Sequence, residues 1–176
     1  MKVKEYYDSN DIPFFKPSDL AFDPAAVSKS EAFVSKNAEK VSRMFDPGAV
    51  LVTCIGATIG KLGIATIRGT CNQQINFLVP HQGVLPEYLA YAIRERKNYL
   101  VDMASSTAVP MINKSQFSKT IIALPPIGAQ REFRSRVEAI DKSKFAILRW
   151  LSYFDREAAT KSARRGLSPA PWWDRD

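Results

Sequence analysis

The sequence predicts an α+β fold: a small, mainly antiparallel sheet with packed helices, followed by one long projecting helix of the coiled-coil type. Residues 50–80 contain three short β-rich runs separated by Gly-containing turns, which is typical of adjacent antiparallel strands. Residues 86–101 carry apolar side chains at helical spacing. From residue 127 onward, apolar side chains alternate at spacings of four and three, which is the heptad pattern.

Length and charge restrict the functional class. The chain has 176 residues, of which 45% are hydrophobic, so we expect one domain with a sizeable core and an appendage. The formal net charge of +7 favours a polyanionic partner, and nucleic acid before a membrane. A basic protein without such a partner remains the alternative.

Cysteine and histidine usage argues against a metal site. Cys54 and Cys71 are the only cysteines and His81 is the only histidine, and none lies at metal-ligand spacing from another. Two reduced thiols in a cytoplasmic protein are favoured over a disulfide. The N-terminus lacks the apolar core of a signal peptide, and no run is long and apolar enough to span a bilayer, so no membrane partner is expected.

The first part of the chain is polar, aromatic and irregular. Residues 12–20 predict a short strand that runs into a turn, with Phe14 or Phe15 buried. Residues 30–38 fit a short helix and a short strand equally well. The Asp-Pro-Gly turn at residues 46–48 starts the sheet, whose strands we expect at residues 50–55, 62–67 and 75–79.

One helix is predicted over residues 86–101, with Pro86 in its first turn. Its apolar stripe is expected to pack on the sheet. The basic residues Arg94, Arg96 and Lys97 are interpreted as a solvated face rather than a phosphate clamp.

A polar loop and a further strand follow this helix. Asn113 and Gln116 have the spacing of a helix cap with a capping box. Residues 120–124 predict another short apolar strand, which Pro125 and Pro126 end.

The heptad region predicts a helix over residues 126–162 that projects from the domain and packs against a partner helix. A helix packed on its own domain would show a similar pattern, but the narrow seam and the start behind two prolines favour projection. Lys144 interrupts the seam. Residues 163–176 contain Pro and Gly without periodicity and are interpreted as a tail. The expected partner-helix interface consists of Phe133, Val137, Ile140, Ile147, Leu151 and Phe154.

The sequence carries no recognisable catalytic motif. Gly56, Gly60 and Lys61 resemble a phosphate-binding loop, but three residues separate the glycines where the Walker pattern needs four, and Leu62 stands where it needs Ser or Thr. Carboxylates are scattered, and neither a nucleophile motif nor a SAM-binding glycine signature is present. We therefore expect no catalysis by this chain alone.

Five segments, in order, resemble the target recognition domain of type I restriction–modification specificity subunits. They are residues 11–15 (DIPFF) with 18–20 (SDL), 56–65 (GATIGKLGIA), 72–76 (NQQIN), 107–115 (TAVPMINKS) and 124–130 (LPPIGAQ). The resemblance implies a curved sheet in a DNA-reading domain at residues 1–125, which here begins inside the domain and is therefore N-terminally truncated. The helix at 126–162 is then a spacer or dimerisation helix.

The resemblance also implies partners. A full subunit of the family has two such domains, and each reads one half of a split double-stranded DNA target. It docks modification (methyltransferase) subunits, and restriction subunits join that complex. SAM, ATP and magnesium belong to those partners, so no cofactor is expected on this chain. The alternative is an assembly module, homodimeric through the long helix, that has lost DNA reading through truncation.

Polar residues of the turns are the expected DNA contacts. Amides and hydroxyls can read base edges, whereas lysines suit phosphates. The competing interpretation assigns Asn72, Asn113 and other motif residues to turns and caps. The expected DNA-binding residues are Thr58, Lys61, Gln73, Gln74, Ser105, Thr107 and Lys114.

Overall fold

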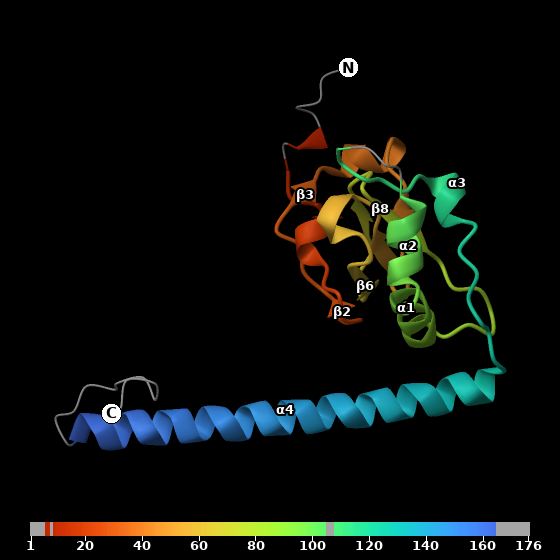
Figure 1. Ribbon diagram of the computed structural model, residues 1–176. Helices are drawn as coiled ribbons and strands as arrows, with labels where there is room; N and C mark the ends of the chain where they lie inside the picture. The colour runs from red at the N-terminus through yellow and green to blue at the C-terminus, as the bar shows by residue number, and fades with distance from the viewer. Residues whose placement is uncertain (1–5, 8, 105–107, 165–176) are drawn as a thin grey trace. The chain divides into compact units, whose positions relative to one another are not determined.

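The computed structural model describes residues 6, 7, 9–104 and 108–164 (Figure 1). The chain divides into two compact units, Met1–Arg131 and Glu132–Asp176. The first unit combines two four-stranded sheets with short helices, and the second contains most of a long helix. The predicted α+β class is confirmed, although two small sheets are present where the sequence predicted one.

The central sheet has the strand order β2-β6-β5-β8. Its strands are β2 (Ala26–Val27), β6 (Leu62–Ala65), β5 (Val50–Thr53) and β8 (Ile75–Leu78). The predicted antiparallel pairing is confirmed, since β5 pairs antiparallel with both β6 and β8. The edge strand β2 pairs parallel with β6 and was not predicted.

The second sheet has the order β3-β1-β7-β4 and was not predicted as a sheet. Its strands are β3 (Phe33–Val34), β1 (Ile12–Phe15), β7 (Gly69–Cys71) and β4 (Met44–Phe45). Such short strands, taken from four separate segments, leave no alternating pattern in the sequence. The predicted first strand is confirmed as β1, and Phe15 is its buried aromatic residue. At the β1–β7 contact, a Cβ on Gly69 would lie 2.9 Å from the Pro13 carbonyl oxygen, so this position requires glycine.

The segment at 30–38, which fitted either element, forms both. It contains β3 and then enters a 3₁₀ helix, η3 (Lys36–Lys40). Ala38 of η3 packs with Ile12 and Val34 in a small core beneath the second sheet.

Alternate side chains of β5 enter two different cores. Val50 and Val52 pack in a core with residues of the helices, including Leu89 and Leu100. Leu51 packs instead with aromatic residues of the second sheet. Because successive strand residues point to opposite faces, the central sheet lies between the helices and the second sheet. Figure 1 shows α1 and α2 in front of the central strands.

The helix predicted at 86–101 is broken, so that prediction was wrong in its continuity. The structure has α1 (Pro86–Arg94) and α2 (Lys97–Met103). The Arg96 N–H donates to the Ile93 carbonyl, and the Leu100 N–H donates to the Arg96 carbonyl to begin the second helix. The change of direction brings Ile93 and Leu100 into the same core, which outweighs the local preference for one continuous helix.

The capping box is confirmed, whereas the strand predicted at 120–124 is wrong. Asn113 caps the short helix α3 (Lys114–Phe117), and the side chains of Asn113 and Gln116 each accept from the other residue's backbone N–H. Residues 120–124 pair with no strand among the described residues. Ile121 is 78% exposed, and Ile122 is the residue that packs on the core, so an extended connection has the same sequence pattern as a strand.

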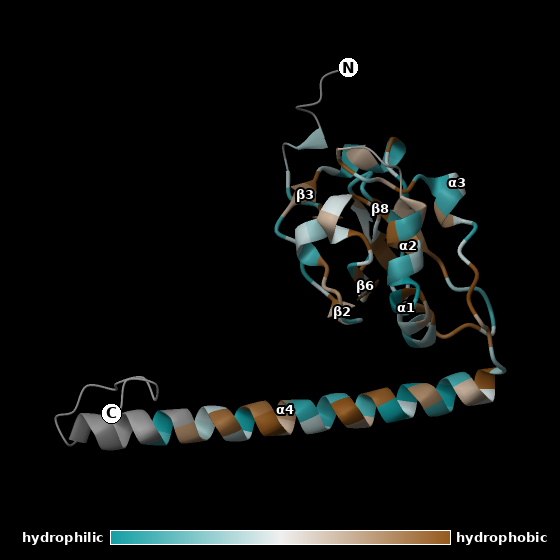
Figure 2. Cartoon of the chain, in the orientation of Figure 1, coloured by the Kyte–Doolittle hydropathy of each residue, from teal (hydrophilic) through white to brown (hydrophobic). Residues whose placement is uncertain are grey.

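The long helix α4 spans Ile127–Arg164. Figure 2 shows apolar bands repeating along it between hydrophilic ones. Ile140, Ile147 and Leu151 of the predicted seam are exposed. Exposed apolar residues also lie outside the seam: Phe145, Leu148, Trp150 and Tyr153. Within the described ranges, no helix combines the length and hydropathy needed to cross a membrane.

Candidate nucleic-acid interface

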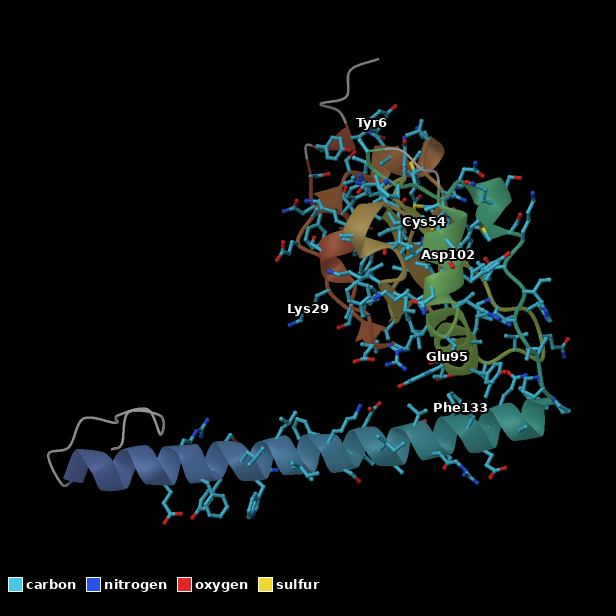
Figure 3. The ribbon with its side chains drawn as sticks, viewed as in Figure 1. Tyr6, Lys29, Cys54, Glu95, Asp102 and Phe133 are labelled. Atoms are coloured by element: carbon cyan, nitrogen blue, oxygen red, sulfur yellow. The ribbon has the colours of Figure 1, made fainter. Side chains whose placement is uncertain are left out.

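Three loops meet at the C-terminal end of β5. The Thr53 N–H donates to the Lys61 carbonyl at 2.8 Å, and the Cys54 N–H donates to the Gln74 carbonyl at 2.8 Å. The Cys54 carbonyl in turn accepts from the Ile112 N–H at 2.9 Å. Cys54 itself lies in the interior (Figure 3), so these loops are anchored on a buried backbone segment.

This arrangement gathers five residues that the sequence predicted as DNA contacts. We call them the β5 rim: Thr58, Lys61, Gln73, Gln74 and Lys114. Thr58 and Lys61 come from the loop before β6, the two glutamines from the turn before β8, and Lys114 from the start of α3. The predicted contacts Ser105 and Thr107 lie outside the described residues.

Thr58 is committed in part to its own turn. It ends the 3₁₀ helix η4 (Gly56–Thr58), and its hydroxyl donates to the Ile55 carbonyl at 2.7 Å. Its carbonyl accepts from the Thr53 hydroxyl. Because a hydroxyl has one proton, Thr58 retains only acceptor capacity toward a ligand while that bond persists.

The turn before β8 separates a fixing residue from an exposed one. The Asn72 side-chain oxygen accepts from the Gln74 N–H at 3.0 Å, which holds the turn. Gln73 is exposed, and its side-chain amide has no hydrogen-bond partner within the described part of the chain. The turn-fixing role is thus carried by Asn72, and both donor and acceptor groups of Gln73 face solvent.

Lys61 belongs to a small basic cluster that sequence reasoning missed. Its Nζ lies 5.7 Å from the centroid of the Phe22 ring, and the Nζ of Lys97 lies 3.9 Å from the same centroid. These are cation–π distances. Neighbouring Asp23 is engaged by Arg94 at 2.7 Å. No local sequence signal links Phe22, Lys61 and Lys97, because the fold brings them together from three separate segments.

Lys114 stands beside an apolar hollow of about 210 Å³. Leu89, Ile93 and Phe117 contribute to its walls, and Arg43 lies over the Phe77 ring with its guanidinium carbon 4.9 Å from the centroid. The hydroxyl of Thr120, also in the lining, is buried without a hydrogen-bond partner among the described residues.

The chemistry of the rim is that of hydrogen bonding and charge. Within the described residues, no group of three or more His, Cys, Asp or Glu side chains could hold a metal ion. Burial raises the pKa of the Cys54 thiol, although Asn76 Nδ2 lies 3.1 Å from its sulfur and opposes that shift. A buried neutral thiol is a poor nucleophile.

Comparison with known families decides the ancestry. A family described as "Type I restriction modification DNA specificity domain" matches residues 1–151. The chain belongs to this family. The resemblance inferred from the five sequence segments is therefore confirmed.

Individual relatives agree with this assignment. The chain is 30% identical over 145 residues to the type I restriction enzyme MjaIX specificity subunit of Methanocaldococcus jannaschii, covering 80% of this chain and 33% of the relative. It is also 30% identical over 141 residues to the HindI specificity subunit of Haemophilus influenzae, covering 78% and 30%. This specificity domain thus spans about a third of the length of these relatives.

Solved structures show the same fold. One of them is a chain from a structural study of complex assembly and conformational transition of the type I R-M system. It superposes on this chain with a TM-score of 0.67 at 20% identity, over 89% of this chain and 38% of that one. The HsdS subunit from Thermoanaerobacter tengcongensis gives a TM-score of 0.61 at 21% identity, over 83% and 34%.

Proposed function

We propose that this chain is the DNA-recognition part of a type I specificity subunit and reads one half of a bipartite double-stranded target. The observation that carries the proposal is the family match over residues 1–151. The relatives are named specificity subunits of type I restriction enzymes, and this chain spans about a third of them. One recognition domain fits one half of a split target.

The geometry of the β5 rim supports DNA reading. Its loops are anchored on buried β5 and present polar side chains from three segments. The exposed amide of Gln73 can donate and accept at once, which suits the paired groups of adenine in the major groove. Lys61 and Lys114 are proposed phosphate contacts that position the domain without reading sequence. The net charge of +7 favours the same ligand.

In this proposal α4 docks the modification subunit, and restriction subunits join through that complex. Its exposed seam, which includes Ile140, Ile147 and Leu151, is an apolar stripe of the kind that a partner helix covers. The chain itself catalyses nothing. Methyl transfer and ATP-driven cleavage, with SAM, ATP and Mg²⁺, belong to the partner subunits.

A second candidate is an assembly module that has lost DNA reading. The exposed apolar seam of α4 and the chain's partial coverage of its relatives favour it. Such a module would associate with itself or with a modification subunit and bind DNA without sequence preference.

The two candidates are separated by selection from DNA. The full chain, alone and co-purified with a modification subunit, is incubated with a pool of random duplexes, and the bound fraction is sequenced after several rounds. Enrichment of one short sequence supports the recognition subunit. Co-purification with the modification subunit but no enriched sequence supports the assembly module.

A further inference from the structure

We infer that Lys97 and Lys61, both lying over the ring of Phe22, form a clamp for the phosphates of one DNA strand beside the β5 rim. The inference rests on the proposed function and adds Lys97 and Phe22 to the interface. It differs from the interpretation of Lys97 as part of a solvated helix face. Phe22 lies in the loop after η2 (Pro17–Asp19), Lys61 lies in the loop before β6, and Lys97 begins α2.

The two ammonium groups of Lys61 and Lys97 lie against one aromatic ring. They lie 5.7 Å and 3.9 Å from one ring centroid, so two like charges contact the same aromatic ring. Their mutual repulsion is unfavourable, and an anion that contacts both ammonium groups adds two attractive interactions that offset it. Neighbouring backbone phosphates of DNA offer a row of such anions.

The charges of Lys61 and Lys97 are not neutralised by acidic side chains of the described residues. Neither ammonium has a carboxylate within ion-pair distance among the described residues. Asp23 and Glu95, the acidic residues nearest in sequence to Phe22 and Lys97, are both engaged by Arg94, at 2.7 Å and 3.4 Å. Arg94 therefore serves the internal ion pairs, while Lys61 and Lys97 keep uncompensated positive charge.

The position of Lys97 is fixed by its packing against the turn at Gly60. Gly60 has a φ of +85°, and a Cβ there would lie 2.9 Å from Cγ of Lys97. The stem of Lys97 thus lies against the turn that carries Lys61 and is half-buried. A side chain held in this way loses less conformational freedom on binding than a free surface lysine does.

The test measures DNA affinity of the full chain against salt concentration, on the selected duplex and on random duplex. Lys97→Gln should reduce the slope of log K against log salt by about 0.9, similarly on both DNAs. Adding Lys61→Gln should reduce it by about as much again. Lys97→Arg should retain the wild-type slope, because the charge remains.

Lys29→Gln is the matched control. Lys29 is exposed and follows β2, whose register places it beyond the end of β6 that is remote from Lys61. The Lys29→Gln substitution removes the same charge as Lys97→Gln and should leave the salt slope unchanged. Melting temperatures of all variants are measured in parallel, so a purely structural role of Lys97 would appear as lost stability with an unchanged slope.

A Lys97→Gln slope equal to that of Lys29→Gln, with wild-type binding intact, overturns the clamp and leaves the proposed function standing. Failure of the wild-type chain to bind any duplex overturns the proposed function and the clamp with it. A reduced slope for Lys97→Gln at an unchanged melting temperature supports the clamp.

Discussion

The buried side chain of Gln130 accepts a hydrogen bond from the backbone N–H of Leu85 through Oε1, at 2.9 Å. Its Nε2 donates to the carbonyls of Gly83 and Pro125, at 3.0 Å and 2.8 Å. Leu85 is the residue that precedes α1. One amide therefore joins the start of α1 to the Pro-Pro segment, and it satisfies three backbone groups from two segments that are distant in the sequence.

Gln130→Ala should destabilise the domain by about 1–3 kcal/mol, because it removes the side-chain partner of the half-buried Leu85 N–H and Pro125 carbonyl. Chemical unfolding measures the loss. Gln82→Ala, at an exposed glutamine in the same loop as Gly83, is the control and should change stability little. Equal stability of the two variants would contradict this role of Gln130.

Cys71 should make stability fall at alkaline pH. Burial raises the pKa of its thiol to about 11, while the charge of Arg43 opposes this shift. An unfolded thiol ionises near its ordinary value of 9.0, so the folded form holds the proton more tightly. The contribution of Cys71 is therefore complete below about pH 9 and is lost as the pH rises toward 11.

Urea unfolding at pH 7 and pH 10 measures this effect. Cys71→Ala removes the titrating group, so it should lose less stability between the two pH values than the wild-type chain. The two proteins share all their other titrating groups, so the difference between their losses of stability reports on Cys71. Identical losses in the two proteins would show that Cys71 does not contribute.

Gln73→Ala should reduce sequence preference without reducing stability. Its amide is exposed and has no partner among the described residues, whereas Asn72 holds the turn. We expect a cost of roughly 1–3 kcal/mol on the selected duplex and little on random duplex. Asn72→Ala is the contrasting variant and should lower the melting temperature. If Gln73→Ala leaves the ratio of affinities for selected and random duplex unchanged, Gln73 does not read a base.

Ile147→Lys should abolish the association of α4 with a partner helix. Ile147 is 58% exposed in the middle of the seam, and a charge there would be buried by any partner. Sedimentation of the full chain, alone and with a modification subunit, measures association. Ser152→Lys places the same charge on the same helix outside the seam and should associate normally. A wild-type chain that stays monomeric and does not bind modification subunits would contradict the proposed role of α4.

The sequence predicted the parts of the fold that local physics determines. β-branched runs placed β5, β6 and β8, and the spacing of Asn113 and Gln116 placed the cap of α3. The heptad pattern predicted a long helix, and α4 runs from Ile127 to Arg164. In each case the signal and the interaction lie within a few residues of each other.

The remaining features depend on contacts between distant segments. The second sheet joins strands of two to four residues whose partners no local pattern reveals. The break between α1 and α2 contains neither Gly nor Pro, so the sequence gives no signal of it. Glu95 and Arg96 are ordinary helix formers. The site shows the same limit. The turns were predicted, but the contact of Lys97 with Phe22 exists only in the folded chain.

DNA recognition by this chain is tested most directly by its affinity for the selected duplex, compared with random duplex across a range of salt concentrations. A DNA-recognition subunit should prefer the selected duplex, with each substituted base pair of the site costing about 1–3 kcal/mol. Its log K should also fall linearly with log salt on both DNAs, by about 0.9 for each phosphate contact. Equal affinity for all duplexes, or affinity that does not change with salt, would contradict this role.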